Sequence, residues 1–177
     1  MKYSSVAVFC GSKNGKNPLF EKQAKELGKL MATHKQTLVY GGGNAGIMGV
    51  IANTMMENGG TVIGIIPELL KDWEHHHEGI TELIIVSDMH TRKKRMYELC
   101  DAAVILPGGF GTLDELFEML TWNQLNIHNK KIILLNSGGY YDNLIGHLHQ
   151  MEAEGFLYES LSNRITICAT PAEIYNN

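Results

Sequence analysis

Cysteine is scarce in this sequence, and its spacing excludes two classes of protein. The 177 residues contain three cysteines, Cys10, Cys100 and Cys168, and they lie far apart. Disulfide-stabilised domains need paired cysteines and structural zinc sites need closely spaced ligands, so neither class fits. The scarcity favours a reducing compartment, and we expect a cytoplasmic protein.

Long apolar runs and an excess of positive charge are also missing. No window approaches the roughly 18 apolar residues of a membrane-spanning helix, and we expect no signal peptide. The formal net charge of -4 gives no electrostatic reason to expect nucleic-acid binding. We therefore predict a single globular domain over residues 1–177, with neither a membrane nor a nucleic acid as its partner.

What the sequence does contain is a regular alternation of short apolar runs and helical patterns. The apolar runs predict strands at residues 5–10, 37–40, 61–66, 83–86, 103–106, 131–136 and 163–169. Helical patterns separate them, which predicts a Rossmann-like, doubly wound α/β fold with a mainly parallel sheet. In such folds ligands bind at the carboxyl ends of the strands, so the turns after residues 10, 40, 86 and 106 should converge on one crevice.

The most informative turn follows the fifth apolar run. The run stops at Pro107, and Gly108, Gly109 and Gly111 then allow a tight turn because they accept backbone angles that a Cβ forbids. Thr112 is predicted to be the N-cap of the next helix. Free N–H groups beside the positive end of a helix form an anion site, most often for phosphate.

Glu115 lies three residues after Thr112 and has two interpretations. Thr112-x-x-Glu115 fits a capping box, in which the carboxylate bonds back to the N-cap N–H group. The carboxylate could equally face a ligand in the crevice. The spacing alone favours neither interpretation.

A second glycine-rich turn follows the run at residues 37–40. Gly41-x-Gly43-x-x-Gly46 formally matches the dinucleotide-binding fingerprint, but no acidic residue ends the next strand, where a ribose-binding carboxylate would stand. We therefore expect no NAD. We assign Gly42 and Gly43, together with Ser12 in the turn after the first strand, to close approach of the backbone to another ligand.

Arg92, Lys93, Lys94 and Arg95 form a short basic run at the start of a predicted helix. Such a run is usually a solvated helix face, which accounts for Lys94 and Arg95. Arg92 and Lys93 are expected in the first turn, where the helix dipole disfavours cations. Their position indicates an anionic ligand, or a carboxylate such as Glu115 across the crevice.

The consecutive histidines His75, His76 and His77 invite a metal-site interpretation. Adjacent side chains point in different directions, so this triplet does not predict a tetrahedral site and we expect no metal. We favour an exposed loop in which a histidine or Glu74 folds over the ligand. The sequence also lacks a G-x-S-x-G elbow and a Walker lysine.

These stretches resemble the signatures of a known family. Residues 107–115, PGGFGTLDE, match the PGGxGTxxE motif of the LOG (Lonely Guy) proteins, and residues 89–93, MHTRK, resemble their MHxRK motif. The glycine stretch at residues 40–49, YGGGNAGIMG, is also characteristic, and the similarity extends over nearly the whole chain. The sequence is identified as a member of this family.

The resemblance implies a homodimer that hydrolyses the N-glycosidic bond of cytokinin riboside 5′-monophosphates or AMP, releasing free base and ribose 5-phosphate. It implies that Arg92 and Glu115 are the catalytic pair. It also implies that the substrate is contacted by Glu74, Lys93, Thr121 and the turn at residues 109–112. No cofactor is implied. Many members carry the label "lysine decarboxylase", but we find no context for the Schiff-base lysine that this chemistry requires.

The sequence does not determine which base the protein prefers. Met89, Trp73 or residues of a partner subunit are candidates for the walls of the base pocket. The alternative function is a non-hydrolytic carrier or sensor of a nucleotide. A pure binder needs the phosphate-binding turn but not the pair of Arg92 and Glu115, so the pair favours the hydrolase.

Overall fold

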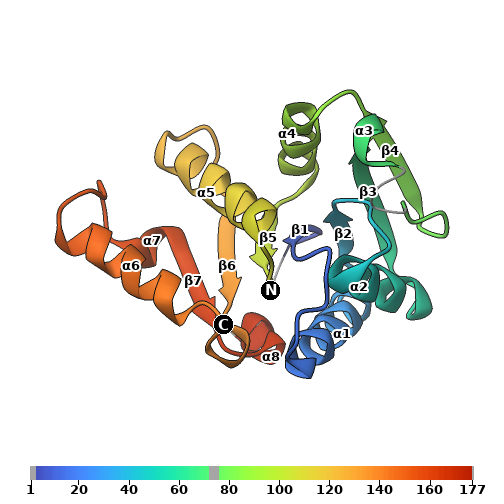
Figure 1. Ribbon diagram of the computed structural model, residues 1–177, viewed down its shortest axis with the longest axis horizontal. Coiled ribbons are helices and arrows are strands. Elements are labelled where there is room, and N and C mark those ends of the chain that lie inside the picture. Colours follow the sequence, from blue (N-terminus) through green and yellow to red (C-terminus); the bar gives the residue numbers. More distant parts are fainter. Residues whose placement is uncertain (1–2, 72–75, 177) are drawn as a thin grey trace.

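The computed structural model describes residues 3–71 and 76–176, and within them the chain forms one parallel sheet (Figure 1). The strand order is β4-β3-β2-β1-β5-β6-β7. The strands are β1 Ser5–Phe9, β2 Thr37–Tyr40, β3 Thr61–Pro67, β4 Glu82–Val86, β5 Ala102–Ile105, β6 Lys131–Leu135 and β7 Ile165–Cys168. This sheet confirms the predicted Rossmann-like, doubly wound fold.

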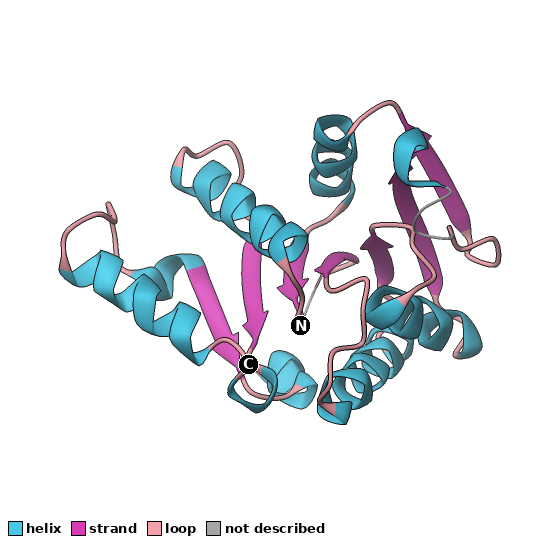
Figure 2. Cartoon of the chain, viewed as in Figure 1, coloured by secondary structure: helices cyan, strands magenta, loops and turns pink. Residues whose placement is uncertain are grey.

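Helices cover both faces of the sheet, as Figure 2 shows. One face packs against α1 Pro18–Thr33, α2 Gly46–Glu57 and α8 Pro171–Asn176. The other packs against α4 Met89–Leu99, α5 Phe110–Gln124 and α6 Asp142–Ala153. The short elements are α3 Glu68–Lys71, η1 Ser137–Gly139 and α7 Leu161–Arg164. Because both faces are covered, the strands read as continuous apolar runs rather than as alternating ones.

Strand β1 shows how the two cores are divided. Val6 and Val8 face the α1 side, whereas Ala7 and Phe9 face the α4 side, and all four are buried. Strand β1 pairs with β2 on one edge and with β5 on the other. The chain therefore leaves β1 in one direction and later returns to its other side, which opens a crevice at the carboxyl ends of β1 and β5.

Local signals place most of the element boundaries to within two residues. The pair Asn17-Pro18 is typical of a helix start, and the structure agrees: the Asn17 side chain accepts a hydrogen bond from Leu19 N at 3.0 Å, and Pro18 occupies the first helical position of α1. The predicted last strand begins two residues late, at Ile165, because residues 161–164 form α7 instead. None of the helices in the described ranges combines the length and apolar character that a membrane span requires.

Two helix starts differ from prediction, and both affect the site. Helix α4 begins at Met89 rather than at Arg92, and Asp88 is its N-cap. Helix α5 begins at Phe110 with Gly109 as its N-cap, so the predicted cap at Thr112 is wrong. Asp88 is a good N-cap residue, so the early start of α4 agrees with side-chain propensity, whereas α5 begins before Thr112 although Thr112 has the stronger capping propensity.

Candidate active site

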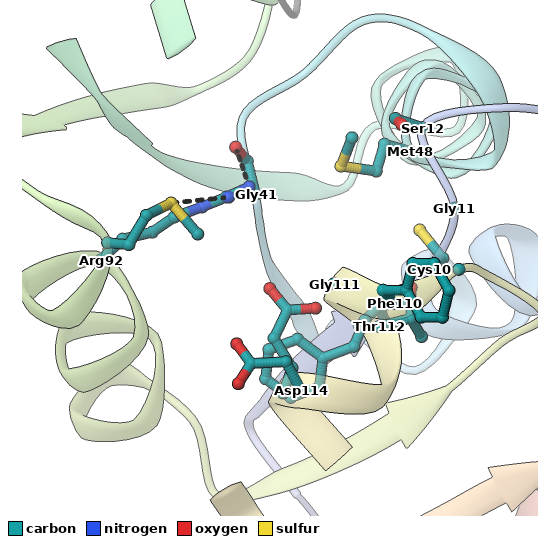
Figure 3. Close-up of a pocket in the computed structure, with 15 residues that line it drawn as sticks. Cys10, Gly11, Ser12, Gly41, Met48, Arg92, Phe110, Gly111, Thr112 and Asp114 are labelled. Atoms are coloured by element: carbon teal, nitrogen blue, oxygen red, sulfur yellow. Dashed lines mark hydrogen bonds between the residues drawn. The ribbon is translucent and has the colours of Figure 1, made fainter. Parts of the chain in front are cut away.

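A pocket of about 220 Å³ lies at the carboxyl edge of the sheet (Figure 3). All four turns that were predicted to converge contribute to it. The described residues that line it are Val8, Phe9, Cys10, Gly11, Ser12, Gly41, Met48, Met89, Arg92, Gly109, Phe110, Gly111, Thr112, Asp114 and Glu115. Parallel strands bring these segments together because their carboxyl ends share one edge of the sheet.

The N-terminus of α5 forms one wall of this pocket. Its cap residue, Gly109, is extended and, being a glycine, offers no side chain to cap the helix. The N–H groups of the first turn have no partners within the helix, so they remain available to a ligand. Gly108 must lack a side chain here, because a Cβ would lie 2.1 Å from Thr112 Oγ1. The turn therefore has the features of an anion site.

Glu115 is the sixth residue of α5, and this position excludes the capping-box interpretation. A capping box requires the acidic residue at the third helical position, where it can reach back to the N-cap. The carboxylate instead belongs to the pocket lining, and Glu115 is only 9% exposed. Burial of a carboxylate is costly, so its position in the pocket needs a reason other than helix capping.

Arg92 reaches the same pocket from α4, where it is the fourth helical residue and is 5% exposed. Its guanidinium donates to the backbone carbonyl of Gly41 at 2.9 Å (Figure 3). It also donates to the backbone carbonyl of Ile65 at 3.1 Å. These two bonds come from the ends of neighbouring strands and hold a buried cation in place. A charge fixed in this way is preorganised for a ligand.

The N-terminus of α4 is stabilised by a carboxylate at its cap. Asp88 accepts hydrogen bonds from Thr91 N and Thr91 Oγ1, each at 2.8 Å. Hydrogen bonds from Ser87 and Thr91 hold the pKa of Asp88 well below its ordinary value. This negative charge at the helix start offsets the unfavourable placement of Arg92 in the first turn.

Lys93 points toward α5 and is absent from the described lining of the pocket. Its ammonium forms ion pairs with Asp114, at 3.0 Å, and with Glu118. Burial alone would lower the pKa of Lys93, but hydrogen bonds to Glu118 and Asp114 outweigh it and raise that pKa. Since α4 starts early, Lys93 also falls beyond the first turn. These ion pairs link α4 to α5.

Within the glycine stretch, Gly41 lines the pocket, whereas Gly42 and Gly43 are not among its described lining residues. Gly42 has a φ of +80°, which favours glycine, and its carbonyl accepts from His77 N at 3.0 Å. Gly43 forms an isolated antiparallel bridge with His76. These two glycines therefore dock the segment that begins at residue 76. The predicted contacts Glu74 and Trp73, and also His75, lie outside the described residues.

Comparison with known proteins decides the family. The family model described as possible lysine decarboxylase matches residues 48–177. A cytokinin riboside 5′-monophosphate phosphoribohydrolase from Rhodococcoides fascians is 44% identical over 165 residues, which cover 93% of this chain and 83% of the relative. One from Arabidopsis thaliana is 41% identical over 172 residues, covering 97% and 79%. The chain belongs to the LOG family.

Solved structures support the fold of this LOG protein. The molybdenum cofactor carrier protein of Chlamydomonas reinhardtii superposes with a TM-score of 0.75 over 99% of this chain and 95% of that chain, at 22% sequence identity. A molybdenum cofactor binding protein from Rippkaea orientalis gives a TM-score of 0.73 at 23% identity over 99% and 95%. At this level of identity the likeness concerns the fold alone.

The description of the family model names a lysine decarboxylase, but the site of this LOG protein offers no support for that chemistry. A pyridoxal-dependent decarboxylase needs a lysine that forms a Schiff base. The part of the pocket that the structure describes is lined by no lysine. Lys93, next to Arg92 in the sequence, is held by carboxylates of α5.

The remaining predicted contacts divide between the pocket and its surroundings. Ser12 and Met89 line the pocket as predicted, whereas Gly108 lines an adjoining hollow of about 260 Å³ that shares Gly11, Ser12 and Gly109 with it. Thr121 lines a separate apolar hollow beside α6. Phe110 lines the pocket within the turn expected at residues 109–112, whereas the lining residues that the prediction missed include Cys10, Gly41, Met48 and Asp114. Gly41, Met48 and Asp114 lie within the stretches that the family resemblance highlighted, and Cys10 ends the first predicted strand.

Proposed function

We propose that this protein hydrolyses the N-glycosidic bond of nucleoside 5′-monophosphates, either cytokinin riboside 5′-monophosphates or AMP. The products are the free base and ribose 5-phosphate. One observation carries the proposal: Arg92 from α4 and Glu115 from α5 line the same pocket, and the N-terminus of α5 lines it as well. The relatives that match this chain carry names that describe the same reaction.

The 5′-phosphate is assigned to the turn at residues 109–112. The amides at the start of α5 supply hydrogen-bond donors, and the positive end of the helix dipole adds electrostatic attraction. The pocket and the adjoining hollow together have the size of a small-molecule site, which is roughly 300–1,000 Å³. A nucleotide therefore has room to extend from the turn toward the other walls.

Glu115 is assigned to the ribose. It lies six residues after the cap Gly109, a rise of about 9 Å along the helix axis, and its side chain leans back toward the N-terminus. This separation places the carboxylate beyond the phosphate, beside the sugar. Cleavage of the bond at C1′ develops positive charge on the ribose, as in other reactions with oxocarbenium-like transition states. A buried carboxylate stabilises that charge strongly.

Arg92 is assigned to the departing base. The oxygen of a water molecule bonds to C1′, the C1′–N bond breaks, and its electron pair moves to the base. The base then gains the proton that the water gives up. The guanidinium stabilises negative charge on the base, while its bonds to Gly41 O and Ile65 O keep it in position. Met89 lines the pocket, and its Sδ lies 3.7 Å from Arg92 Nη1, so we assign Met89 to the base as well.

We also propose a cytoplasmic homodimer. Apolar side chains are exposed on α5 and in the loop that follows α6, including Phe117, Phe156 and Tyr158, and a hollow between these elements is lined by both Phe117 and Tyr158. Exposed apolar side chains gathered in one region are typical of protein–protein interfaces. Light scattering after size-exclusion chromatography should give twice the mass of one chain.

Product analysis tests the proposed reaction. Purified protein is incubated separately with AMP and with isopentenyladenosine monophosphate, and the products are separated by chromatography. We expect free base from the wild type, and rates lower by about 10²–10³ for Glu115→Gln, which keeps the shape of the side chain but removes its charge. The ratio of the two wild-type rates gives the base preference.

Two results would contradict the proposal. Near-normal turnover by a folded Glu115→Gln variant would remove Glu115 from the chemistry. Intact nucleotide after incubation with wild-type protein, with binding measured by calorimetry, would instead favour a carrier or sensor.

A further inference from the structure

Three consecutive carbonyls in front of α5 are each held by a hydrogen bond from elsewhere in the chain. The carbonyls of residues 106–108 accept, in order, from Tyr141 Oη at 2.7 Å, Gly11 N at 3.0 Å and Tyr140 Oη at 2.7 Å. These three bonds determine the directions of three successive peptide groups. Neither tyrosine is among the described lining residues of the pocket, but Tyr140 lines the adjoining hollow.

The bond from Tyr140 bears on the peptide group between Gly108 and Gly109. In a trans peptide the carbonyl and the N–H group point in opposite directions. The Gly108 carbonyl is directed toward Tyr140, which lines the adjoining hollow. The Gly109 N–H group is therefore directed away from that tyrosine, and Gly109 lines the pocket.

This peptide group needs an external constraint. It has glycine on both sides, and glycine accepts backbone angles of either sign, so a rotation of the peptide group is sterically cheap. A Cβ at Gly109 or at Gly111 would meet no atom within 4 Å. Gly108 packs closely against Thr112, so packing restricts only that side of the peptide group, and a hydrogen bond must hold the Gly109 side.

The two tyrosines are placed by the turn after β6. Gly138 and Gly139 have φ values of +56° and +76°, which reverse the chain direction within η1. Asn136 Oδ1 accepts from Tyr141 N at 2.7 Å, and the Tyr140 ring packs edge-on against Phe20 at 5.3 Å between centroids. The ring of Tyr140 is thus fixed even though the residue is 46% exposed.

We propose that the Tyr140 hydroxyl is a positioning group for the phosphate-binding turn. It holds the Gly108–Gly109 peptide in the orientation that presents the Gly109 N–H group to the 5′-phosphate. This inference rests on the proposed function, because it assumes that the turn binds phosphate. Tyr141, which is buried and bonded to the Leu106 carbonyl, holds the base of the same turn.

The test uses Tyr140→Phe, which keeps the ring and its packing on Phe20 but removes the hydroxyl. Binding of ribose 5-phosphate is measured by calorimetry, and adenine is measured as an inhibitor of AMP hydrolysis. We expect the Kd for ribose 5-phosphate to rise about three- to tenfold, the range that one net hydrogen bond supplies. The KM for AMP should rise by a similar factor, while inhibition by adenine stays unchanged.

Tyr175→Phe is the matched control. Its hydroxyl also makes one hydrogen bond, to Gln36 Oε1 at 2.6 Å, but Tyr175 lies outside the pocket. The control should change the Tm without changing the Kd for ribose 5-phosphate.

Each other outcome overturns a defined part of the reasoning. If Tyr140→Phe binds ribose 5-phosphate as tightly as the wild type, the positioning role is wrong. If the variant weakens ribose 5-phosphate and adenine equally and lowers the Tm, the tyrosine supports the whole fold rather than the turn. If the wild type itself neither binds ribose 5-phosphate nor releases base, the proposed function fails together with the inference.

Discussion

Substitution of Gly41 by alanine should displace the Arg92 side chain although Arg92 itself is not mutated. A Cβ at Gly41 would lie 2.0 Å from Arg92 Nη2, 3.1 Å from Arg92 Cζ and 3.2 Å from Met48 Sδ. The first distance is far below any van der Waals contact, so something must move. The guanidinium is the end of a flexible side chain, whereas Gly41 follows a central strand, and we expect the guanidinium to withdraw.

The size of the effect follows from the bonds that this movement breaks. To restore an ordinary contact the guanidinium must retreat by at least about 1 Å. It then loses its bond to Gly41 O, and its bond to Ile65 O is strained or lost. Hydrogen bonds to charged groups contribute about 1.5–3 kcal/mol each, so loss of the Gly41 bond alone should lower stability by about 1.5–3 kcal/mol. Misplacement of a catalytic group by about 1 Å can lower the rate by about 10²-fold.

The assay is steady-state hydrolysis of AMP, with thermal unfolding measured on the same preparations. We expect kcat/KM for Gly41→Ala to fall by about 10²-fold or more while the protein remains folded. Gly146→Ala is the control, because a Cβ there would meet no atom within 4 Å and its helix should gain stability by up to about 1 kcal/mol. A kcat/KM for Gly41→Ala within threefold of wild type would show that the position of Arg92 does not control the reaction.

Three further predictions concern the surroundings of the pocket. Lys93→Met should lower stability by about 1–3 kcal/mol in thermal unfolding, because it removes two ion pairs of a buried lysine and one of its partners, Glu118, is half-buried. Its KM for AMP should stay within threefold, and a large rise in KM with unchanged Tm would instead place Lys93 on the substrate. Gly108→Ala should weaken ribose 5-phosphate binding in calorimetry far more than Gly111→Ala, because only the first added Cβ clashes, with Thr112 Oγ1. Burial lowers the pKa of His77, so the folded protein favours the neutral imidazole. The free energy of unfolding is therefore highest above pH 6.5, the ordinary pKa of the unfolded chain, and falls on acidification because the unfolded state then binds the proton more readily. Urea unfolding at pH 7.5 and 5.5 should show this loss, and His77→Gln should reduce it.

The sequence by itself determined the architecture and the location of the site. Apolar runs such as residues 103–106 predict strands that are buried on both faces; the strand forms at Ala102–Ile105, and its burial follows from helices on both sides of a parallel sheet. Asn17 and Pro18 predict a helix start from purely local chemistry, which the structure confirms. Convergence of the four turns also follows from the sequence, because parallel strands all end at one edge. The family motifs then marked the segments that line the pocket.

The tertiary structure alone decided how these segments meet. Thr112 has the stronger capping propensity, yet α5 begins at Phe110, and Thr112 packs closely against Gly108 instead. The same shift turns Glu115 from a possible helix cap into a residue of the pocket wall. Arg92 is held by carbonyls 51 and 27 residues away in the chain, and Lys93 by carboxylates of another helix. Local patterns report the conformation of neighbouring residues, whereas the partners of a buried charge are set by the packing of distant elements.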